Sequence, residues 1–274
     1  MKRIRFHVTM NMPLVTSVSE DELHRNPDDY VRMGDVYKME LAGDTREIAR
    51  PGQFVNLALD GKFLRRPISV CDWDGAVPQA ADGDFLVEAD DGFLTLVYKV
   101  VGHGTEQMVR LDPGDAVDAL VGLGNGYDVD ACPDRTLLVG GGAGIPPLYA
   151  LAKQLIAAGK HPTAVLGFNR EDEIFYSQEF AALDIPVILT TVDGSVGVKG
   201  FVTDAMPERA YVCCCGPEPM LKAVYNKCAD GQFSFEARMG CGFGACMGCS
   251  MQTANGPKRI CKDGPIFKKE EIVW

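Results

Sequence analysis

Four cysteines near the end of the chain constrain its fold most tightly. In the stretch MGCGFGACMGC, Cys241, Cys246 and Cys249 have the spacing C-x4-C-x2-C, and Cys261 follows in PKRICKDG. This spacing is typical of a plant-type [2Fe-2S] site, in which four thiolates hold two irons. The fold is therefore expected to bring these four side chains together.

The residues between the cysteines support a cluster site. A loop around an iron-sulfur cluster points main-chain N–H groups inward, and Gly242, Gly244 and Gly248 allow the positive φ angles and close approach that this requires. A structural zinc site is the main alternative, but zinc knuckles usually contain two matched short cysteine pairs, and only one short pair exists here. A disulfide framework is a third interpretation, but it belongs to small secreted domains.

The composition narrows the class of protein. A chain of 274 residues is long enough for two domains and a small appendage, and no run approaches the length of a membrane span. The start, MKRIRFHVTMNMPLV, alternates like a strand and lacks the features of a signal peptide, so a cytoplasmic location is expected. Ten cysteines without an export signal favour metal binding and reduced thiols, and the net charge of −11 disfavours a nucleic-acid partner.

The pattern of strands and helices changes near Pro133. Before it, short runs such as VYKMELAG, RPISVCDWDG, FLVEADDG and FLTLVYKVVG end in turn residues, which predicts an antiparallel β-barrel over residues 1–132. After it, strands alternate with helices, which predicts a doubly wound parallel sheet over residues 133–231. Residues 232–274 are expected to form a small cluster domain. The acidic stretch SVSEDELHRNPDDY is expected to be a surface loop or a short helix.

Two strand ends of the second region are candidate nucleotide contacts. In LLVGGGAGIPPLYAL a buried strand runs into glycines and a helix, a turn that lets a dinucleotide pyrophosphate lie against free N–H groups, although an ordinary tight turn is the alternative. In AYVCCCGPEPML, alternation puts Cys213 and Cys215 on one face and Cys214 on the other. Cys213 and Cys214 are expected to be packed thiols, and Cys215 is a candidate neighbour of a nicotinamide. The candidate residues at these two ends are Gly140, Gly141, Gly142, Gly144, Cys215, Gly216 and Pro217.

Two shorter motifs lie in the barrel region. LRRPISV offers an arginine that fits a diphosphate with paired hydrogen bonds, and Ser69 is placed to face a flavin ring. LVYKVVGHGT adds a glycine pair beside Thr105, again suited to main-chain contact with phosphate, with His103 expected in a loop. Each of these motifs is weak by itself.

In combination and in this order, RRPISV, VYKVVGHGT, LLVGGGAGIPPLYAL, CCCGPEPML, CGFGACMGC and KRICKDGPIF resemble the electron-transfer subunits of B-type dihydroorotate dehydrogenase, in the ferredoxin reductase superfamily. The resemblance spans nearly the whole chain, and SEDELHRNPDDYVRMG looks longer than the family's usual link between the first two strands. It implies an FAD-binding barrel, an NAD-binding α/β domain and a C-terminal [2Fe-2S] domain. The residues that it implies for FAD are Arg66, Pro67, Ile68 and Ser69, with Ser69 near the reactive flavin nitrogen, Val97, Tyr98 and Lys99 along the ring and ribityl chain, and Gly104 and Thr105 at the pyrophosphate.

The resemblance also implies a function. A nicotinamide exchanges two electrons as a hydride, a [2Fe-2S] cluster takes one at a time, and a flavin does both, so FAD is expected between them. A separate FMN-containing catalytic subunit would oxidise dihydroorotate to orotate in pyrimidine biosynthesis, with electrons passing through the cluster and FAD to NAD+. No residue of this chain is assigned to dihydroorotate chemistry. The alternatives are an NAD(P)H-dependent ferredoxin or sulfur reductase subunit of the same superfamily and, in another class, a non-redox zinc-stabilised binding module.

The second strand of the α/β region ends in LGFNREDEIFY, which bears on the choice of nucleotide. An acid there suits a free ribose hydroxyl, whereas a cationic cluster suits a 2′-phosphate. Arg170 is followed by Glu171, Asp172 and Glu173, so the sequence favours NAD over NADP. Arg170 is expected either to pair with Glu173 or to reach the ribose.

Overall fold

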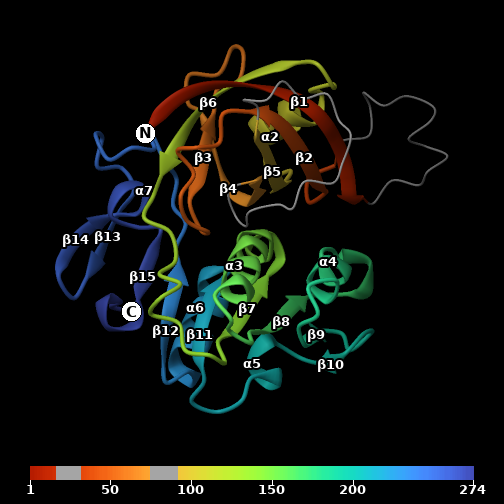
Figure 1. The fold of residues 1–274 in the computed structure, drawn as a ribbon, viewed down its shortest axis with the longest axis vertical. Coiled ribbons are helices and arrows are strands. Elements are labelled where there is room, and N and C mark those ends of the chain that lie inside the picture. The colour runs from red at the N-terminus through yellow and green to blue at the C-terminus, as the bar shows by residue number, and fades with distance from the viewer. Residues whose placement is uncertain (17–31, 75–91) are drawn as a thin grey trace.

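The computed structural model describes residues 1–16, 32–74 and 92–274, which form a barrel, an α/β domain and a C-terminal segment that lies beside both (Figure 1). The acidic stretch and all but the last residue of the predicted strand FLVEADDG lie outside the described residues. No helix of the described ranges is both long and apolar enough to cross a membrane.

Six antiparallel strands close the barrel in the order β1-β2-β5-β4-β3-β6, which confirms the predicted barrel. Alternate side chains fill its interior, among them Phe6, Met39 and Leu94, which are fully buried. One helix, α2 (His103–Val109), connects β5 to β6 and begins at His103, where a loop was expected. The Thr105 hydroxyl explains why the helix begins here, because it accepts hydrogen bonds from the main-chain N–H groups of Val101 and Gly102. The strands are β1 (Lys2–Val15), β2 (Val36–Gly43), β3 (Phe54–Leu57), β4 (Arg66–Trp73), β5 (Gly92–Lys99) and β6 (Ala116–Leu123).

A seven-stranded sheet in the order β10-β9-β8-β7-β11-β12-β15 forms the α/β domain, and every pair except β12–β15 is parallel. One apolar core packs α3 and α4 on one face, and a second packs α5 and α6 on the other, so the doubly wound arrangement is confirmed. The elements are β7 (Leu137–Gly141), α3 (Pro146–Ala157), β8 (Thr163–Phe168), α4 (Ser177–Ala181), β9 (Val187–Thr191), β10 (Val198–Lys199), α5 (Val202–Ala205), β11 (Tyr211–Cys215), α6 (Glu218–Lys227) and β12 (Asp230–Ser234), with short 3-10 turns over Gly142–Gly144 and Glu171–Glu173.

The three adjacent cysteines of β11 follow the predicted alternation. Cys213 and Cys215 belong to the core under α3, and Cys214 belongs to the opposite core. Cys213 and Cys214 are completely buried, as expected of packed thiols.

The C-terminal segment is attached to the edge of this sheet. It contains the hairpin β13 (Ser250–Thr253) and β14 (Gly256–Arg259), then α7 (Ile260–Asp263), β15 (Ile266–Lys268) and a 3-10 turn over Lys269–Glu271. β15 pairs antiparallel with β12, and Figure 1 shows the segment in blue beside the barrel and the sheet. The predicted boundary between residues 231 and 232 falls inside β12, so the last segment shares a strand with the sheet.

A largely buried ion pair links the barrel to the α/β domain. Lys153 on α3 donates to both carboxylate oxygens of Asp72 on β4, at 2.9 and 2.8 Å. The two side chains are only 19% and 14% exposed. Burial raises the pKa of Asp72 despite its hydrogen bonds to Lys153, so the lysine offsets the cost of a buried carboxylate.

Replacing Lys153 with alanine is expected to lower the free energy of unfolding by about 3 kcal/mol, because Asp72 would keep its desolvation cost and lose its partner. Urea unfolding of the cofactor-loaded chain measures the change. Lys2→Ala is the matched control, since its pair with Asp44 lies at the surface and is worth about 0–1 kcal/mol. Equal losses for the two variants would contradict this role for the ion pair.

Candidate functional site

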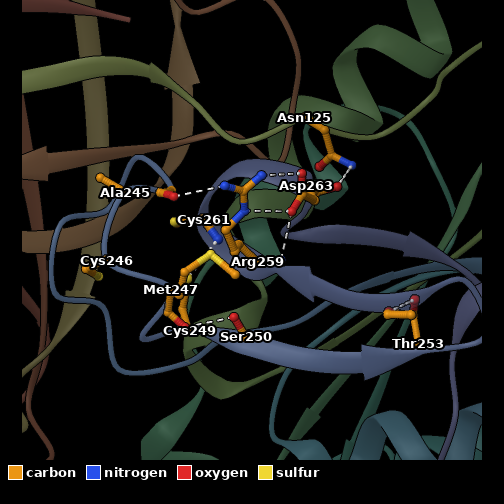
Figure 2. A network of polar contacts seen from close by, with 12 residues as sticks. Asn125, Ala245, Cys246, Met247, Cys249, Ser250, Thr253, Arg259, Cys261 and Asp263 are labelled. Atoms are coloured by element: carbon orange, nitrogen blue, oxygen red, sulfur yellow. Dashed lines mark hydrogen bonds and ion pairs between the residues drawn. The ribbon is translucent and has the colours of Figure 1, made fainter.

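The four motif cysteines lie in the C-terminal segment, three on the loop before β13 and Cys261 on α7. Figure 2 shows Cys246, Cys249 and Cys261. The N–H groups of Ala245 and Cys246 donate to the Cys241 Sγ at 3.2 and 3.4 Å. The Gly248 N–H points at the Cys246 Sγ at 3.5 Å, and the Cys261 N–H at the Cys249 Sγ at 3.4 Å. The loop thus turns main-chain donors toward sulfur, as thiolates at an iron-sulfur cluster require.

The thiols fall into two contacting pairs, Cys241 with Cys246 and Cys249 with Cys261. Cys246 is exposed, whereas Cys249 and Cys261 are buried. Although burial opposes ionisation, main-chain N–H groups lower the pKa of Cys241 to about 6. In the other pair, burial and the Cys249 thiol raise the pKa of Cys261 to about 12.

The paired arrangement bears on which metal site fits. A structural zinc site places four ligands around one ion. A [2Fe-2S] cluster instead takes two thiolates on each of two irons. The two contacting pairs, Cys241 with Cys246 and Cys249 with Cys261, match the cluster arrangement.

Backbone conformation explains two of the three predicted loop glycines. Gly242 and Gly244 have φ angles of 77° and 90°, which glycine adopts without strain. Gly248 lies outside the left-handed region, so that part of the prediction is wrong. The tight turn falls one residue earlier, at Met247 with φ of 61°.

Arg259 holds the loop against α7, a contact that the sequence analysis missed. Its Nη1 donates to the Gly244 carbonyl at 2.9 Å, and its Nε donates to Asp263 Oδ2 at 3.0 Å (Figure 2). The bond from Arg259 lowers the pKa of Asp263. The spacing of four residues between Arg259 and Asp263 in PKRICKDG was the available signal.

In the barrel, Arg66 and Gly104 lie against one another. A Cβ added at Gly104 would overlap the Arg66 guanidinium, so the arginine lies directly against the glycine. The Thr105 hydroxyl donates to the Gly102 carbonyl at 3.0 Å and is occupied within its own turn. The two weak motifs are therefore neighbours in space, as a shared phosphate site requires.

A cavity of about 1000 Å³ lies between the barrel and the α/β domain. Its wall includes predicted flavin contacts and predicted nucleotide contacts together. The predicted residues that line it are Pro67, Ser69, Lys99, Gly141, Gly142, Gly144, Cys215, Gly216 and Pro217. Because a flavin and a nicotinamide must meet to exchange electrons, a shared cavity is what both predictions require.

Other predicted flavin contacts point elsewhere. The Tyr98 hydroxyl donates to Asn11 Oδ1 at 3.0 Å inside the barrel, and its ring stacks on Tyr37. Ile68 packs against the same barrel core, and Val97 belongs to the core under α3. The side chains of Tyr98 and Ile68 therefore pack inside the barrel, and only the main chain at these positions is left to contact a flavin ring.

The nucleotide turn packs closely on β11. A Cβ at Gly144 would overlap the Cys215 carbonyl, and one at Gly140 would press on Ile145 and Leu148 of the following turn and helix. Burial raises the pKa of Cys215 to about 12, so its thiol stays protonated at neutral pH.

The fully buried Thr190 hydroxyl also lines the cavity and has no hydrogen-bond partner within the described ranges. A buried hydroxyl without a partner suits a polar ligand.

The acidic strand end also borders the cavity. Arg170 Nη2 pairs with Asp172 at 2.9 Å, whereas its Nε lies 3.9 Å from Glu173, so Asp172 is its closer partner. Sequence reasoning missed other parts of the wall, at residues 200–203 and 234–237. They follow β10 and β12 and carry no motif that could have identified them.

Comparison with known proteins identifies relatives along nearly the whole chain. Residues 236–273 match the iron-sulfur cluster binding domain of dihydroorotate dehydrogenase B, and residues 138–226 match the oxidoreductase NAD-binding domain. Electron transfer subunits of dihydroorotate dehydrogenase B (NAD(+)) are similar to this chain. The one from a Geobacillus species is 42% identical and the one from Fusobacterium nucleatum 39% identical, each alignment covering 87% of this chain and 93% of the relative.

A solved structure of an NADH-dependent reduced ferredoxin-NADP oxidoreductase, described in work on flavin-based electron bifurcation, is also similar. It has a TM-score of 0.74 and 30% identity, covering 98% of this chain and 89% of that chain. A ferredoxin reductase of carbazole 1,9a-dioxygenase, at 18% identity and a TM-score of 0.61, shares the fold.

Replacing Cys246 with serine is expected to abolish the iron-sulfur absorption while FAD stays bound, because Cys246 does not line the cavity. Iron and sulfide analysis with a visible spectrum measures both. Cys228→Ser, at a cysteine of the α6 end outside the motif, should retain full iron content. Unchanged iron and sulfide in the Cys246 variant would refute the ligand assignment.

Proposed function

The chain belongs to the family of electron transfer subunits of dihydroorotate dehydrogenase B, and from this premise we propose how its residues carry electrons between a catalytic partner and NAD. The partner is an FMN-containing subunit that oxidises dihydroorotate. Cys241, Cys246, Cys249 and Cys261 hold the [2Fe-2S] cluster, and the barrel holds FAD. The cytoplasmic location stays a prediction.

One observation carries this proposal. The cavity joins Ser69 of the barrel to Cys215 of the α/β domain, and the cysteine loop contacts β3, the neighbour of Ser69's strand. The cysteine loop, the barrel strands β3 and β4, and the glycine turn after β7 therefore follow one another in space. This is the order in which electrons from an outside partner would reach a nicotinamide.

The bound cofactors supply the electron chemistry, with FAD converting between the one-electron exchange of a cluster and the two-electron exchange of a nicotinamide. The chain's residues supply position. Arg66 donates charge-assisted hydrogen bonds to the flavin diphosphate beside Gly104. Gly142 and Gly144 present main-chain N–H groups to the dinucleotide pyrophosphate at the start of α3. Ser69 lines the cavity from the barrel and Cys215 from the α/β domain, so a flavin and a nicotinamide held there would lie between them.

The cysteine loop is the proposed docking face for the catalytic partner. Cys246 is exposed, and the flanking side chains of Phe243 and Met247 are 42% and 53% exposed. Apolar side chains beside an exposed cluster ligand suit a partner that must come close to the cluster. The relatives' name, electron transfer subunit, supports a separate catalytic chain.

The most direct test of this function mixes the purified holoprotein with an FMN-containing dihydroorotate dehydrogenase catalytic subunit, dihydroorotate and NAD+. NADH formation that needs both chains supports the proposal. The alternative, a subunit of a ferredoxin-NADP reductase, rests on the relative at 30% identity. Reduction of ferredoxin or NADP without any dihydroorotate-dependent NADH would favour that alternative.

Arg66→Ala should weaken FAD binding by roughly 1.5–3 kcal/mol, the loss of hydrogen bonds to a charged group. Fluorescence of FAD released on dilution gives the dissociation constant. Arg110→Ala serves as the control, since Arg110 caps the opposite end of α2. The diphosphate role would be disproved by equal FAD retention in the two variants.

NADH is expected to be preferred over NADPH, because the carboxylates after β8 repel a 2′-phosphate and Arg170 is already paired with Asp172. Steady-state kinetics with both nucleotides give the ratio of kcat/KM. Asp172→Asn with Glu173→Gln should narrow that ratio, whereas Glu179→Gln on α4 should leave it unchanged. A kcat/KM for NADPH equal to or above that for NADH in the unmodified chain would overturn the prediction.

A further inference from the structure

Asn56 lies where the barrel meets the cysteine loop. It is on β3 and 1% exposed. Across the β3–β4 register it faces Pro67, and two residues earlier on its own strand face lies Phe54. Pro67 and Phe54 both line the cavity, so Asn56 stands between the cavity wall and the loop.

The Asn56 side chain contacts the loop at its first cysteine. Its Nδ2 donates to the main-chain oxygen of Cys241 at 3.3 Å. A Cβ at Gly242 would overlap the same amide, so the loop rests directly on Asn56. One side chain of the barrel therefore meets both Cys241 and Gly242.

The backbone of Asn56 is fixed independently of the loop. Arg65 Nη1 donates to the Asn56 carbonyl at 3.2 Å and to the Asp118 carbonyl at 3.1 Å. Arg65 Nη2 also pairs with the Asp118 carboxylate at 2.5 Å. β3 is thus anchored to β6 at the position from which Asn56 reaches the loop.

The oxygen of the Asn56 side-chain amide adds no hydrogen bond to the part of the fold that the structure describes. Asn56 Oδ1 is buried and has no hydrogen-bond partner among the residues that the structure describes. A buried acceptor without a partner costs free energy, and an apolar side chain of similar size would avoid that cost. Packing alone would favour an apolar side chain at this position, so the presence of an uncharged donor calls for another explanation. The hydrogen bond from Asn56 to the Cys241 carbonyl provides it.

We propose that Asn56 is a positioning residue that sets the cysteine loop, and with it the cluster, against the flavin side of the barrel. This inference rests on the proposed function. The amide holds the Cys241 peptide in place without bringing a charge to the thiolates. Its loss leaves both cofactors bound but loosens the geometry between them.

The test uses Asn56→Leu in the full chain purified with its cofactors, because leucine keeps the size of the side chain but cannot donate to the Cys241 carbonyl. Asn56→Ala is a second variant that removes the amide. Iron, sulfide and FAD content, together with flavin reduction by NADH, should match the unmodified chain. Iron release to a chelator should be faster by roughly two- to tenfold, the factor given by one ordinary hydrogen bond. The electron paramagnetic resonance spectrum of the reduced cluster should shift. Gln252→Leu, at an exposed amide on β13, is the control and should change none of these.

A double-mutant cycle tests the same contact from the loop. Gly242→Ala should speed iron release by itself, because its Cβ meets the Asn56 amide and its φ of 77° strains alanine. In the Asn56→Ala background the added effect should be smaller, since the overlapping atoms are gone. Additive effects would show that Asn56 and the loop act separately, which contradicts the proposal.

The outcomes separate this inference from the function on which it rests. Asn56 variants with full cofactor content and unchanged iron release and resonance spectrum would overturn the positioning role and leave the function standing. An unmodified chain that holds neither iron-sulfide nor FAD would overturn the proposed function, and the inference with it.

Discussion

The side chain of Asn125 joins the barrel to the C-terminal segment, and the placement of the sites depends on this junction. Its Nδ2 donates to the carbonyl of Asp263 at 3.2 Å (Figure 2). The same Nδ2 donates to the Ile266 carbonyl at 2.7 Å, and its Oδ1 accepts the Ile266 N–H at 3.1 Å. Ile266 opens β15, which pairs with β12 of the sheet, and Asp263 closes the helix that carries Cys261. One amide thus fixes the barrel, the cysteine helix and the sheet edge relative to one another.

That junction explains how a short segment can serve two larger domains. Because β15 extends the sheet, the cysteine loop cannot drift away from the α/β domain. Because Asn125 and Asn56 reach it from the barrel, it also stays beside the strands that wall the cavity. Cys246 is exposed, whereas Cys249 and Cys261 are buried. The cysteine site therefore has one side open to solvent and one side packed against the rest of the protein.

The sequence predicted what depends on local pattern. Cysteine spacing predicted the loop, strand alternation predicted the faces of Cys213, Cys214 and Cys215, and glycine turns predicted one wall of the cavity. Contacts between distant residues have no such pattern. Asn56 meets Cys241 across 185 positions and Asn125 meets Ile266 across 141, and an asparagine in a strand or turn has no local feature that identifies its partner. The direction of the Tyr98 side chain was likewise set by barrel packing rather than by its motif.

The central claim is that two pairs of cysteines hold two irons where the C-terminal segment meets the barrel. Anomalous diffraction at the iron edge, on crystals of the cofactor-loaded chain, tests it most directly. The account predicts two iron peaks in each chain, one beside Cys241 and Cys246 and the other beside Cys249 and Cys261. A peak with the anomalous edge of zinc, or an iron analysis that gives one iron in each chain, would contradict it.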